Sequence, residues 1–287
     1  MGDGKSELLL GLLRPGDRVL EFGTFVGYSS LRLAQQLRRL GGGGQVVSCE
    51  VGADAACVAR ELHSFAGFDP TEVKVQIGSA ADWLASGRLG EADVLVMDHR
   101  GTRYHEDLAA LESSGSGAFG SRPGSRVFAD NVLLPGAPLF LDYVSRSSEC
   151  LPNNNYNHNH NNNHNNNNKN EGCRSLPQPR YQLAIHEVPE FLQPELDDWV
   201  VVCEPQGLKA VSTTAWPPAD LLRLSAQIDA FSWQSERQSV DWAELQEIVS
   251  PMMQHLRKSA EAATATTTTA TSSGEAAQQD PSGREAS

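Results

Sequence analysis

The chain of 287 residues carries 36 acidic and 23 basic residues, and its formal net charge of −13 argues against nucleic acid or an anionic membrane as a partner. Its five cysteines are scattered and form no Cys-x-x-Cys pair, a pattern typical of reduced thiols rather than of a disulfide framework or a zinc site. No apolar run reaches about 18 residues and no signal-peptide pattern opens the chain, so we expect a cytoplasmic, monomeric protein that does not bind membranes.

Short apolar segments alternate with helical patterns along the first part of the chain. We expect helices over 5–13, 31–40, 53–65 and 82–89, and strands over 18–23, 45–50, 73–77 and 94–98. A fifth strand before Asp130, a helix near 138–146 and a hairpin-like pair of strands over 181–188 and 198–204 follow. Strands that alternate with helices at this spacing indicate βαβ units. The sequence therefore predicts an α/β fold, with a mostly parallel sheet covered by helices on both faces.

The composition divides the chain into a domain and two appended segments. We expect one domain over residues 1–205, interrupted at 153–170 by an insert of 13 Asn, three His and two other residues. The three His residues show no ligand spacing, so we interpret the insert as low-complexity sequence rather than a transition-metal site. Residues 216–262 show two apolar stripes and are expected to form a helical extension. The segment 263–287, rich in Ala, Thr and Ser, is expected to be a disordered tail.

Oxygen-bearing side chains follow two of the expected strands. Asp98 ends the strand over 94–98, and the pair Asp130 and Asn131 follows the fifth strand, just before a Pro-Gly turn. Open α/β sheets bind ligands beyond the carboxyl ends of their strands, and oxygen ligands suit a hard cation such as Mg²⁺. The sequence therefore predicts a site for a hard cation such as Mg²⁺ at these strand ends, beside a cofactor site and beneath a substrate lid formed by later residues.

A glycine loop follows the first strand, in the pattern Glu21-x-Gly23-x-x-x-Gly27. It differs from the dinucleotide pattern G-x-G-x-x-G, in which three glycines admit a pyrophosphate. Glu50 ends the next strand, where an acid accepts ribose hydroxyls in nucleotide-binding folds. A plain strand–turn–helix junction with an incidental acid would also explain the loop alone. The acids at successive strand ends favour a cofactor site, and S-adenosylmethionine fits it better than a dinucleotide.

Several segments together resemble the catechol O-methyltransferase family over about residues 1–205, with the Asn/His insert excluded. The most specific is Ala-Asp-Asn-Val-Leu-Leu-Pro-Gly-Ala-Pro at 129–138, and the others lie at 2–5, 20–30, 64–68, 97–99 and 103–104. The resemblance implies a single-domain, Rossmann-like methyltransferase fold that uses S-adenosylmethionine and Mg²⁺. It also implies that Asp98, Asp130 and Asn131 are the metal ligands.

The same resemblance implies roles for the residues around the cofactor. Glu21 and Ser29 would hold the methionine end, Glu50 the ribose and Val51 the adenine pocket, while His99 would form a wall near the adenine. Ser79 would replace the serine that the family carries at the position of Ala80. The complete expected set for the cofactor is Met1, Glu21, Gly23, Gly27, Ser29, Glu50, Val51, Ser79, Asp98 and His99.

The chain departs from the family at the residue expected to act as a base. The family carries a lysine three residues after the first metal aspartate, and this chain has Gly101 there. Arginine is a poor general base, so we expect Arg100 to act as an electrostatic partner of an ionised acceptor. Glu190, or alternatively Glu187, is expected to accept a hydrogen bond from the second hydroxyl of the acceptor. Restoring a lysine at Gly101 should raise the rate if the missing base is the defect.

The sequence favours an S-adenosylmethionine- and Mg²⁺-dependent O-methyltransferase that acts on a catechol-like small molecule, of the catechol O-methyltransferase class. Two alternatives stay open. The acceptor is another vicinal-hydroxyl compound, such as a flavonoid or a caffeoyl ester, or the chain is a catalytically degenerate, methyltransferase-like binding protein. Family members carry helices ahead of the segment at 2–5, and the expected helices over 218–262 would cover that surface here.

Overall fold

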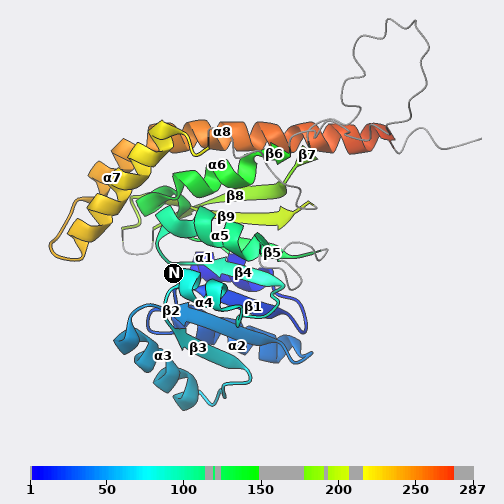
Figure 1. The fold of residues 1–287 in the computed structure, drawn as a ribbon, viewed down its shortest axis with the longest axis vertical. Helices are drawn as coiled ribbons and strands as arrows, with labels where there is room; N and C mark the ends of the chain where they lie inside the picture. The colour runs from blue at the N-terminus through cyan, green and yellow to red at the C-terminus, as the bar shows by residue number, and fades with distance from the viewer. Residues whose placement is uncertain are drawn as a thin grey trace, which may run out of the picture.

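The computed structural model describes residues 2–113, 119, 124–148, 178–190, 193–206 and 216–274. Within them, seven strands form one sheet in the order β3-β2-β1-β4-β5-β9-β8 (Figure 1). These strands are β1 Arg18–Phe22, β2 Gln45–Glu50, β3 Val73–Ile77, β4 Val94–Met97, β5 Arg126–Ala129, β8 Tyr181–Pro189 and β9 Asp197–Pro205. A separate two-stranded pair joins β6 Ser147–Ser148 to β7 Gln178–Pro179. The insert expected at 153–170 lies outside the described residues.

Eight α-helices and two shorter helical turns connect or extend these strands in the described part of the chain. The α-helices are α1 Asp3–Gly11, α2 Tyr28–Leu40, α3 Ala53–Phe65, α4 Ala80–Ser86, α5 Tyr104–Ser113, α6 Pro138–Ser145, α7 Ala219–Ser235 and α8 Trp242–Gly274. The turns are η1 Gly101–Arg103, of the 3-10 type, and η2 Val132–Gly136. The sequence patterns do not identify α5, which follows η1 directly at Tyr104.

The pairing of the strands confirms the predicted fold class. Strand β1 lies between β2 and β4 and is parallel to both, and β3 and β5 extend the parallel part on either side. Strand β9 pairs antiparallel with β5 and with β8, so the expected terminal strand pair closes one edge of the sheet. The chain crosses from β3, on one side of β1, to β4 on the other. This reversal of strand order is where open α/β sheets bind ligands.

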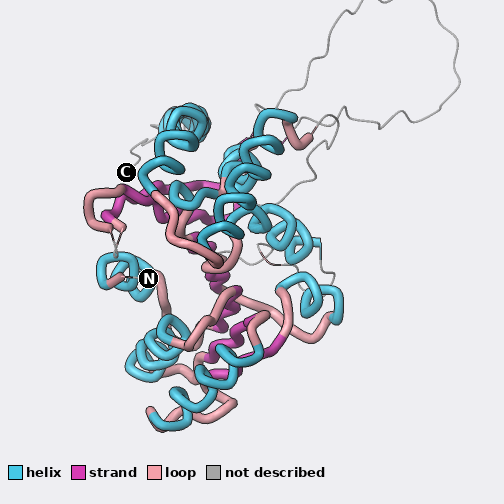
Figure 2. Tube along the Cα trace, turned by 90° about the vertical axis from the view of Figure 1, so that its left-hand side faces the viewer, coloured by secondary structure: helices cyan, strands magenta, loops and turns pink. Residues whose placement is uncertain are grey.

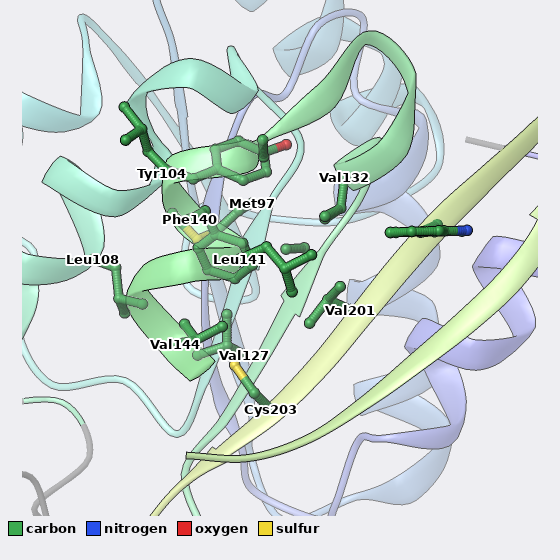
Figure 3. Packing of buried hydrophobic residues seen from close by; sticks show 14 of the residues in the cluster. Met97, Tyr104, Leu108, Val127, Val132, Phe140, Leu141, Val144, Val201 and Cys203 are labelled. Atoms are coloured by element: carbon green, nitrogen blue, oxygen red, sulfur yellow. The ribbon is translucent and has the colours of Figure 1, made fainter. Parts of the chain in front are cut away.

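Helices cover both faces of the sheet, as Figure 2 shows. Alternate residues of β4 are buried on opposite faces of the sheet, because successive side chains of a strand point in opposite directions. Val94 and Val96 belong to the core beneath α1 and α2, whereas Leu95 and Met97 belong to the larger core beneath α4, α5 and α6. Figure 3 shows this second core, where Met97 lies among fully buried side chains of several elements.

The C-terminal extension is part of the larger core. Helices α7 and α8 lie beside α6, at the end of the sheet opposite α3 (Figure 1). Leu221, Leu224 and Ile228 of α7, with Leu245 and Val249 of α8, are buried in that core. The helix α8 continues past Ala263 to Gly274, so the tail expected to begin at Ala263 is helical over its first part, and 275–287 lie outside the described residues. No described helix has the length and hydropathy needed to span a bilayer.

Candidate functional site

The carboxyl ends of the parallel strands surround a cavity of about 500 Å³ at the point where the strand order reverses. Six of the expected cofactor residues line it, from the ends of β1, β2, β3 and β4: Gly23, Glu50, Val51, Ser79, Asp98 and His99. The fold therefore brings together residues that lie as much as 76 positions apart, as the strand-end pattern predicts.

Glycine is required where the β1 loop passes the end of β4. The backbone of Gly23 has φ +96°, and a Cβ there would lie 2.2 Å from the carbonyl oxygen of Asp98. Gly27 has φ +91°, and its Cβ would lie 2.8 Å from that of Ala59. Only a residue without a side chain avoids both the strained φ and the clash. The two glycines of the loop thus permit close packing of backbone around the cavity.

The carboxylate of Glu50 is fixed at the rim of the cavity. The backbone N–H of Phe25 donates to Oε2 at 2.7 Å, and the N–H of Gly52 donates to Oε1 at 2.7 Å. Phe25 and Val51, which also line the cavity, are 71% and 72% exposed. Large apolar side chains exposed at a concave site indicate a ligand with an apolar surface. The pair therefore offers apolar faces beside a carboxylate that can accept hydrogen bonds.

Glu21, which precedes the cavity-lining Phe22 on β1, is not itself among the lining residues, and its carboxyl group is fully buried. Burial raises the pKa of Glu21 to about 7, although hydrogen bonds from Ser29 and Ser48 act against that rise. The oxygen Oε1 has no hydrogen-bond partner among the described residues. A buried carboxyl group with an unsatisfied oxygen is costly unless a ligand or water supplies a donor. Glu21 is therefore suited to a cationic donor such as an amino group.

Two further expected residues lie at the cavity, and one lies outside the described chain. The hydroxyl of Ser79 accepts from the N–H of Asp82 and so caps α4. The ring of His99 is 5.6 Å from that of Phe22 between centroids, and its Nε2 lies 2.8 Å from Oδ2 of Asp107. This contact orients the His99 ring as a wall. Met1 lies outside the described residues.

The expected metal ligands Asp98, Asp130 and Asn131 lie at the ends of β4 and β5, and together they are called the candidate metal corner below. Burial, followed by repulsion from Asp130, raises the pKa of Asp98 well above its usual range. Asp130 is 1% exposed, and its Oδ2 has no hydrogen-bond partner among the described residues. The side-chain nitrogen of Asn131 donates to the carbonyl of Leu134 at 3.0 Å, which leaves the amide oxygen as its second polar atom. A cation between these oxygens would relieve both the repulsion and the unsatisfied oxygen.

A buried lysine, not identified from the sequence as a site residue, joins this corner to β9. The ammonium of Lys5 lies 2.9 Å from Oδ1 of Asp130, 2.6 Å from Oδ2 of Asp198 and 3.1 Å from Oε2 of Glu190. Burial disfavours its charge, but Asp130 and Asp198 outweigh that effect and raise the pKa of Lys5 above its ordinary value. The only signal in the sequence is that Lys5 belongs to a segment carrying the family resemblance.

Asp198 was also not identified from the sequence. It fixes η2, the turn that follows the candidate metal corner. It is fully buried, and its Oδ1 accepts from the backbone N–H groups of Leu133 at 3.2 Å and Leu134 at 2.9 Å. Its Oδ2 accepts from the side-chain nitrogen of Asn131 at 3.0 Å. Lys5 and Asp198 therefore position the candidate metal ligands from two distant parts of the chain.

The structure distinguishes the two acids considered for the acceptor. Glu190 lines a second cavity of about 190 Å³ together with Asn131. Glu187 instead pairs with Arg257 of α8, and its side chain is 57% exposed. Glu190 therefore lies beside the candidate metal corner, and Glu187 does not take part in it.

Helix α7 closes one side of the larger cavity through Ile228, Asp229 and Ser232. Arg100, expected to assist an ionised acceptor, lines that cavity but also contacts α7. Its guanidinium lies 3.4 Å from Asp229, 3.4 Å from Glu236 and 4.1 Å from the centroid of the Trp233 ring. Arg100 therefore also links the wall of the cavity to the helical extension through these contacts.

Gly101 cannot accept a lysine without a shift of the backbone. A Cβ at this buried position would lie 2.7 Å from the carbonyl oxygen of Gly136 and 3.2 Å from the Cβ of Ala137. The chain therefore packs η1 against η2 at the place where the family carries its lysine. A lysine here would have to displace η1 or η2, so the packing opposes the expected gain in rate.

We expect Gly101→Lys to lower the free energy of unfolding by about 1–3 kcal/mol, the usual cost of overpacking. The control is Gly4→Lys, because a Cβ at Gly4 has no atom within 4 Å. Urea denaturation of both variants measures the difference. A Gly101→Lys variant as stable as Gly4→Lys, with a higher rate of methyl transfer, would contradict this packing argument.

Comparisons with known proteins agree with this geometry. Residues 5–115 match a family model described as O-methyltransferase. The chain is 39% identical over 149 residues to a transmembrane O-methyltransferase of Homo sapiens, covering 50% of this chain and 49% of that protein. It is 32% identical over 164 residues to the catechol O-methyltransferase of Mus musculus, covering 54% and 59%. The chain spans about half the length of these curated relatives.

Solved structures share the fold. Cofactor-bound Rv0187 from MTB superposes with a TM-score of 0.51 at 19% identity, covering 72% of this chain and 82% of that one. The O-methyltransferase TomG from Streptomyces achromogenes, in complex with SAM, gives a TM-score of 0.50 at 22% identity, also covering 72% and 82%. These similarities confirm the Rossmann-like, methyltransferase-type sheet.

Proposed function

From the match of residues 5–115 to the O-methyltransferase family model, we propose that the chain transfers a methyl group from S-adenosylmethionine to a hydroxyl of a catechol-like small molecule, with Mg²⁺ as a second cofactor. The observation that carries the proposal is the position of Asp98. Asp98 lines the same cavity as Gly23 and Glu50. Burial, and after it repulsion from Asp130, raises the pKa of Asp98. A cofactor cavity and a candidate metal corner therefore share one residue.

The volume and the polar groups of the larger cavity support S-adenosylmethionine as its ligand. Its volume of about 500 Å³ lies within the range of cofactor sites, roughly 300–1,000 Å³. Glu50 would accept from the ribose hydroxyls, and Val51 with Phe25 would contact the adenine. Glu21 would accept from the amino group through its unsatisfied oxygen. The bound cofactor supplies the electrophilic methyl group.

The residues of the metal corner fit Mg²⁺. Asp98, Asp130 and Asn131 would hold it through oxygen atoms, the ligand type that Mg²⁺ requires. Among the described residues no group of three or more His, Cys, Asp and Glu side chains forms a metal site, and here the third oxygen belongs to an amide. The bound ion supplies a Lewis acid that lowers the pKa of a coordinated hydroxyl. Lys5 holds the opposite oxygen of Asp130 and so orients that carboxylate.

The acceptor would lie in the second cavity, between Asn131 and Glu190. Glu190 would accept a hydrogen bond from the hydroxyl that is not methylated, and Lys5 fixes its carboxylate at 3.1 Å. Two hydroxyls on adjacent carbons satisfy both polar groups at once. This favours a vicinal diol over a monohydroxyl acceptor, and flavonoids or caffeoyl esters carry the same group.

Isothermal titration with S-adenosylmethionine, followed by a methyl-transfer assay with a catechol panel, tests the proposal. We expect binding of the cofactor and transfer that disappears when Mg²⁺ is chelated. Absence of cofactor binding would refute the proposal as a whole. Binding without transfer to any vicinal diol would favour the alternative of a degenerate binding protein, which the absence of a lysine at Gly101 motivates.

Cofactor binding should release a proton from Glu21 near neutral pH. Burial raises the pKa of Glu21 to about 7, and an ammonium group placed against it would lower that pKa. Affinity should therefore fall as the pH drops below about 7, because the protonated acid must first ionise. Titration calorimetry at pH 6.5 in buffers of different ionisation enthalpy measures the proton release.

Glu21→Gln provides the control for this titration. The variant should bind more weakly and show no proton release, and its affinity should vary less between pH 6 and pH 8. Proton release of the same size in Glu21→Gln would assign the titration to another group.

A further inference from the structure

The second cavity adjoins the cofactor cavity and ends at the helical extension. Pro135 lines both cavities, so they meet at the turn that follows Asn131. The polar residues Asn131, Glu190 and Gln193 line the second cavity together with the apolar Leu134, Pro135 and Trp242. Trp242 is the first residue of α8, well outside the segment that matches the family model.

Trp242 is held firmly in place. Its ring packs edge-on against Phe231 of α7, with 5.4 Å between centroids. The helix that begins at Trp242 packs against η2, and Leu245 and Val249 anchor it in the core. Trp242 is itself half-buried and packs against the larger core, so its ring lies between that core and the cavity. The extension therefore supplies a rigid wall to the proposed acceptor site.

We propose that Trp242 is a specificity-determining residue that limits the acceptor to a single aromatic ring. The inference rests on the proposed function and deepens it. The cavity measures about 190 Å³, and an apolar cavity of about 150 Å³ is known to accommodate one benzene ring. A diol of one ring fits, whereas a rigid two-ring diol needs the space that the indole fills. The wall thereby decides between a simple catechol and a fused or extended acceptor.

The test compares catechol with 2,3-dihydroxynaphthalene, which carries the same diol on a rigid second ring. We expect the wild-type protein to prefer catechol in kcat/KM by at least about tenfold, since even small steric differences in a pocket discriminate by 10- to 200-fold. In Trp242→Ala the preference should fall by about tenfold or more, and Trp242→Phe should lie between the two. Equal preference in the wild type and both variants would overturn the proposal.

A binding measurement and a control variant separate failure of this proposal from failure of the proposed function. Equilibrium binding of both diols to the protein saturated with S-adenosylhomocysteine reads the size of the cavity without turnover, so a failure of transfer alone counts against the proposed function and not against this wall. Ile248→Ala, at a 47% exposed position of α8, is the matched control and should leave the preference unchanged. If Trp242→Ala does not fold, as shown by circular dichroism, Trp242→Phe carries the same comparison, and an unchanged preference there overturns the proposal.

Discussion

Replacing Lys5 with methionine is expected to lower the free energy of unfolding by about 3–5 kcal/mol, the cost of removing one partner from a buried ion pair. The lysine side chain is 4% exposed and contacts Asp130 and Asp198, whose side chains are 1% and 0% exposed. Without the ammonium, two carboxylates remain buried in a region of low dielectric with no countercharge. Chemical denaturation at pH 8 measures the loss.

The dependence of this defect on pH distinguishes lost charge from lost packing. Burial raises the pKa of Asp198 to about 6 even with Lys5 present, and removing Lys5 would raise it further. The folded variant then binds more protons than the unfolded chain, so its stability falls as the pH rises and recovers as the pH drops toward 5. Methionine keeps the length of the side chain, so a loss caused by packing alone would not vary with pH.

The control for Lys5→Met is Lys74→Met, at an exposed position of β3. It should change the free energy of unfolding by no more than about 0.5 kcal/mol, as surface substitutions usually do. The double variant Lys5→Met/Asp198→Asn should be more stable than Lys5→Met, because it removes one of the two uncompensated charges. A Lys5→Met variant as stable as Lys74→Met would mean that the cluster contributes nothing to folding.

Asp130→Asn is expected to reduce methyl transfer by about 10³-fold while leaving the fold intact. A metal ion supplies several kcal/mol of transition-state stabilisation, and each 1.36 kcal/mol corresponds to about tenfold in rate. An asparagine would present its oxygen to Lys5 and its nitrogen, which does not bind metals, at the position of the unsatisfied Oδ2. Lys5 keeps Asp198 at 2.6 Å, so the buried cation retains a partner.

Two measurements check this variant. Thermal unfolding in the presence of S-adenosylmethionine should show a shift with added Mg²⁺ in the wild type and none in Asp130→Asn, which does not depend on turnover. Asp54→Asn, at an exposed position in the first turn of α3, should behave as the wild type in both assays. Transfer by Asp130→Asn at the wild-type rate would exclude this residue as a metal ligand.

Local patterns in the sequence were sufficient for the sheet and for the strand ends that line the larger cavity. The alternation of apolar strands and helices predicts a parallel sheet, and the carboxyl ends of parallel strands necessarily meet at one edge. For this reason Glu50 and Asp98 could be predicted to lie at this edge, since Glu50 is the last residue of β2 and Asp98 directly follows β4. The position of Gly23 follows from the same logic, because a loop that passes this edge closely requires glycine.

The network around the metal corner depends on contacts that no local pattern encodes. Lys5 and Asp198 are 193 positions apart, and each lies in a segment whose own pattern explains it as part of a helix or strand. Their pairing exists only because α1 and β9 are placed beside β5. Gly101 belongs to the same category, since its contact with Gly136 depends on how η1 packs on η2.

By itself the sequence determined the class of fold, the strand ends that surround the larger cavity and the resemblance to the O-methyltransferases. The tertiary structure alone decided that Glu190 and not Glu187 lines the second cavity, that Arg100 contacts α7, and that Trp242 lines the second cavity. The physical reason is that periodicity reports which face of an element is buried, whereas the partner it meets is set by the packing of the whole chain.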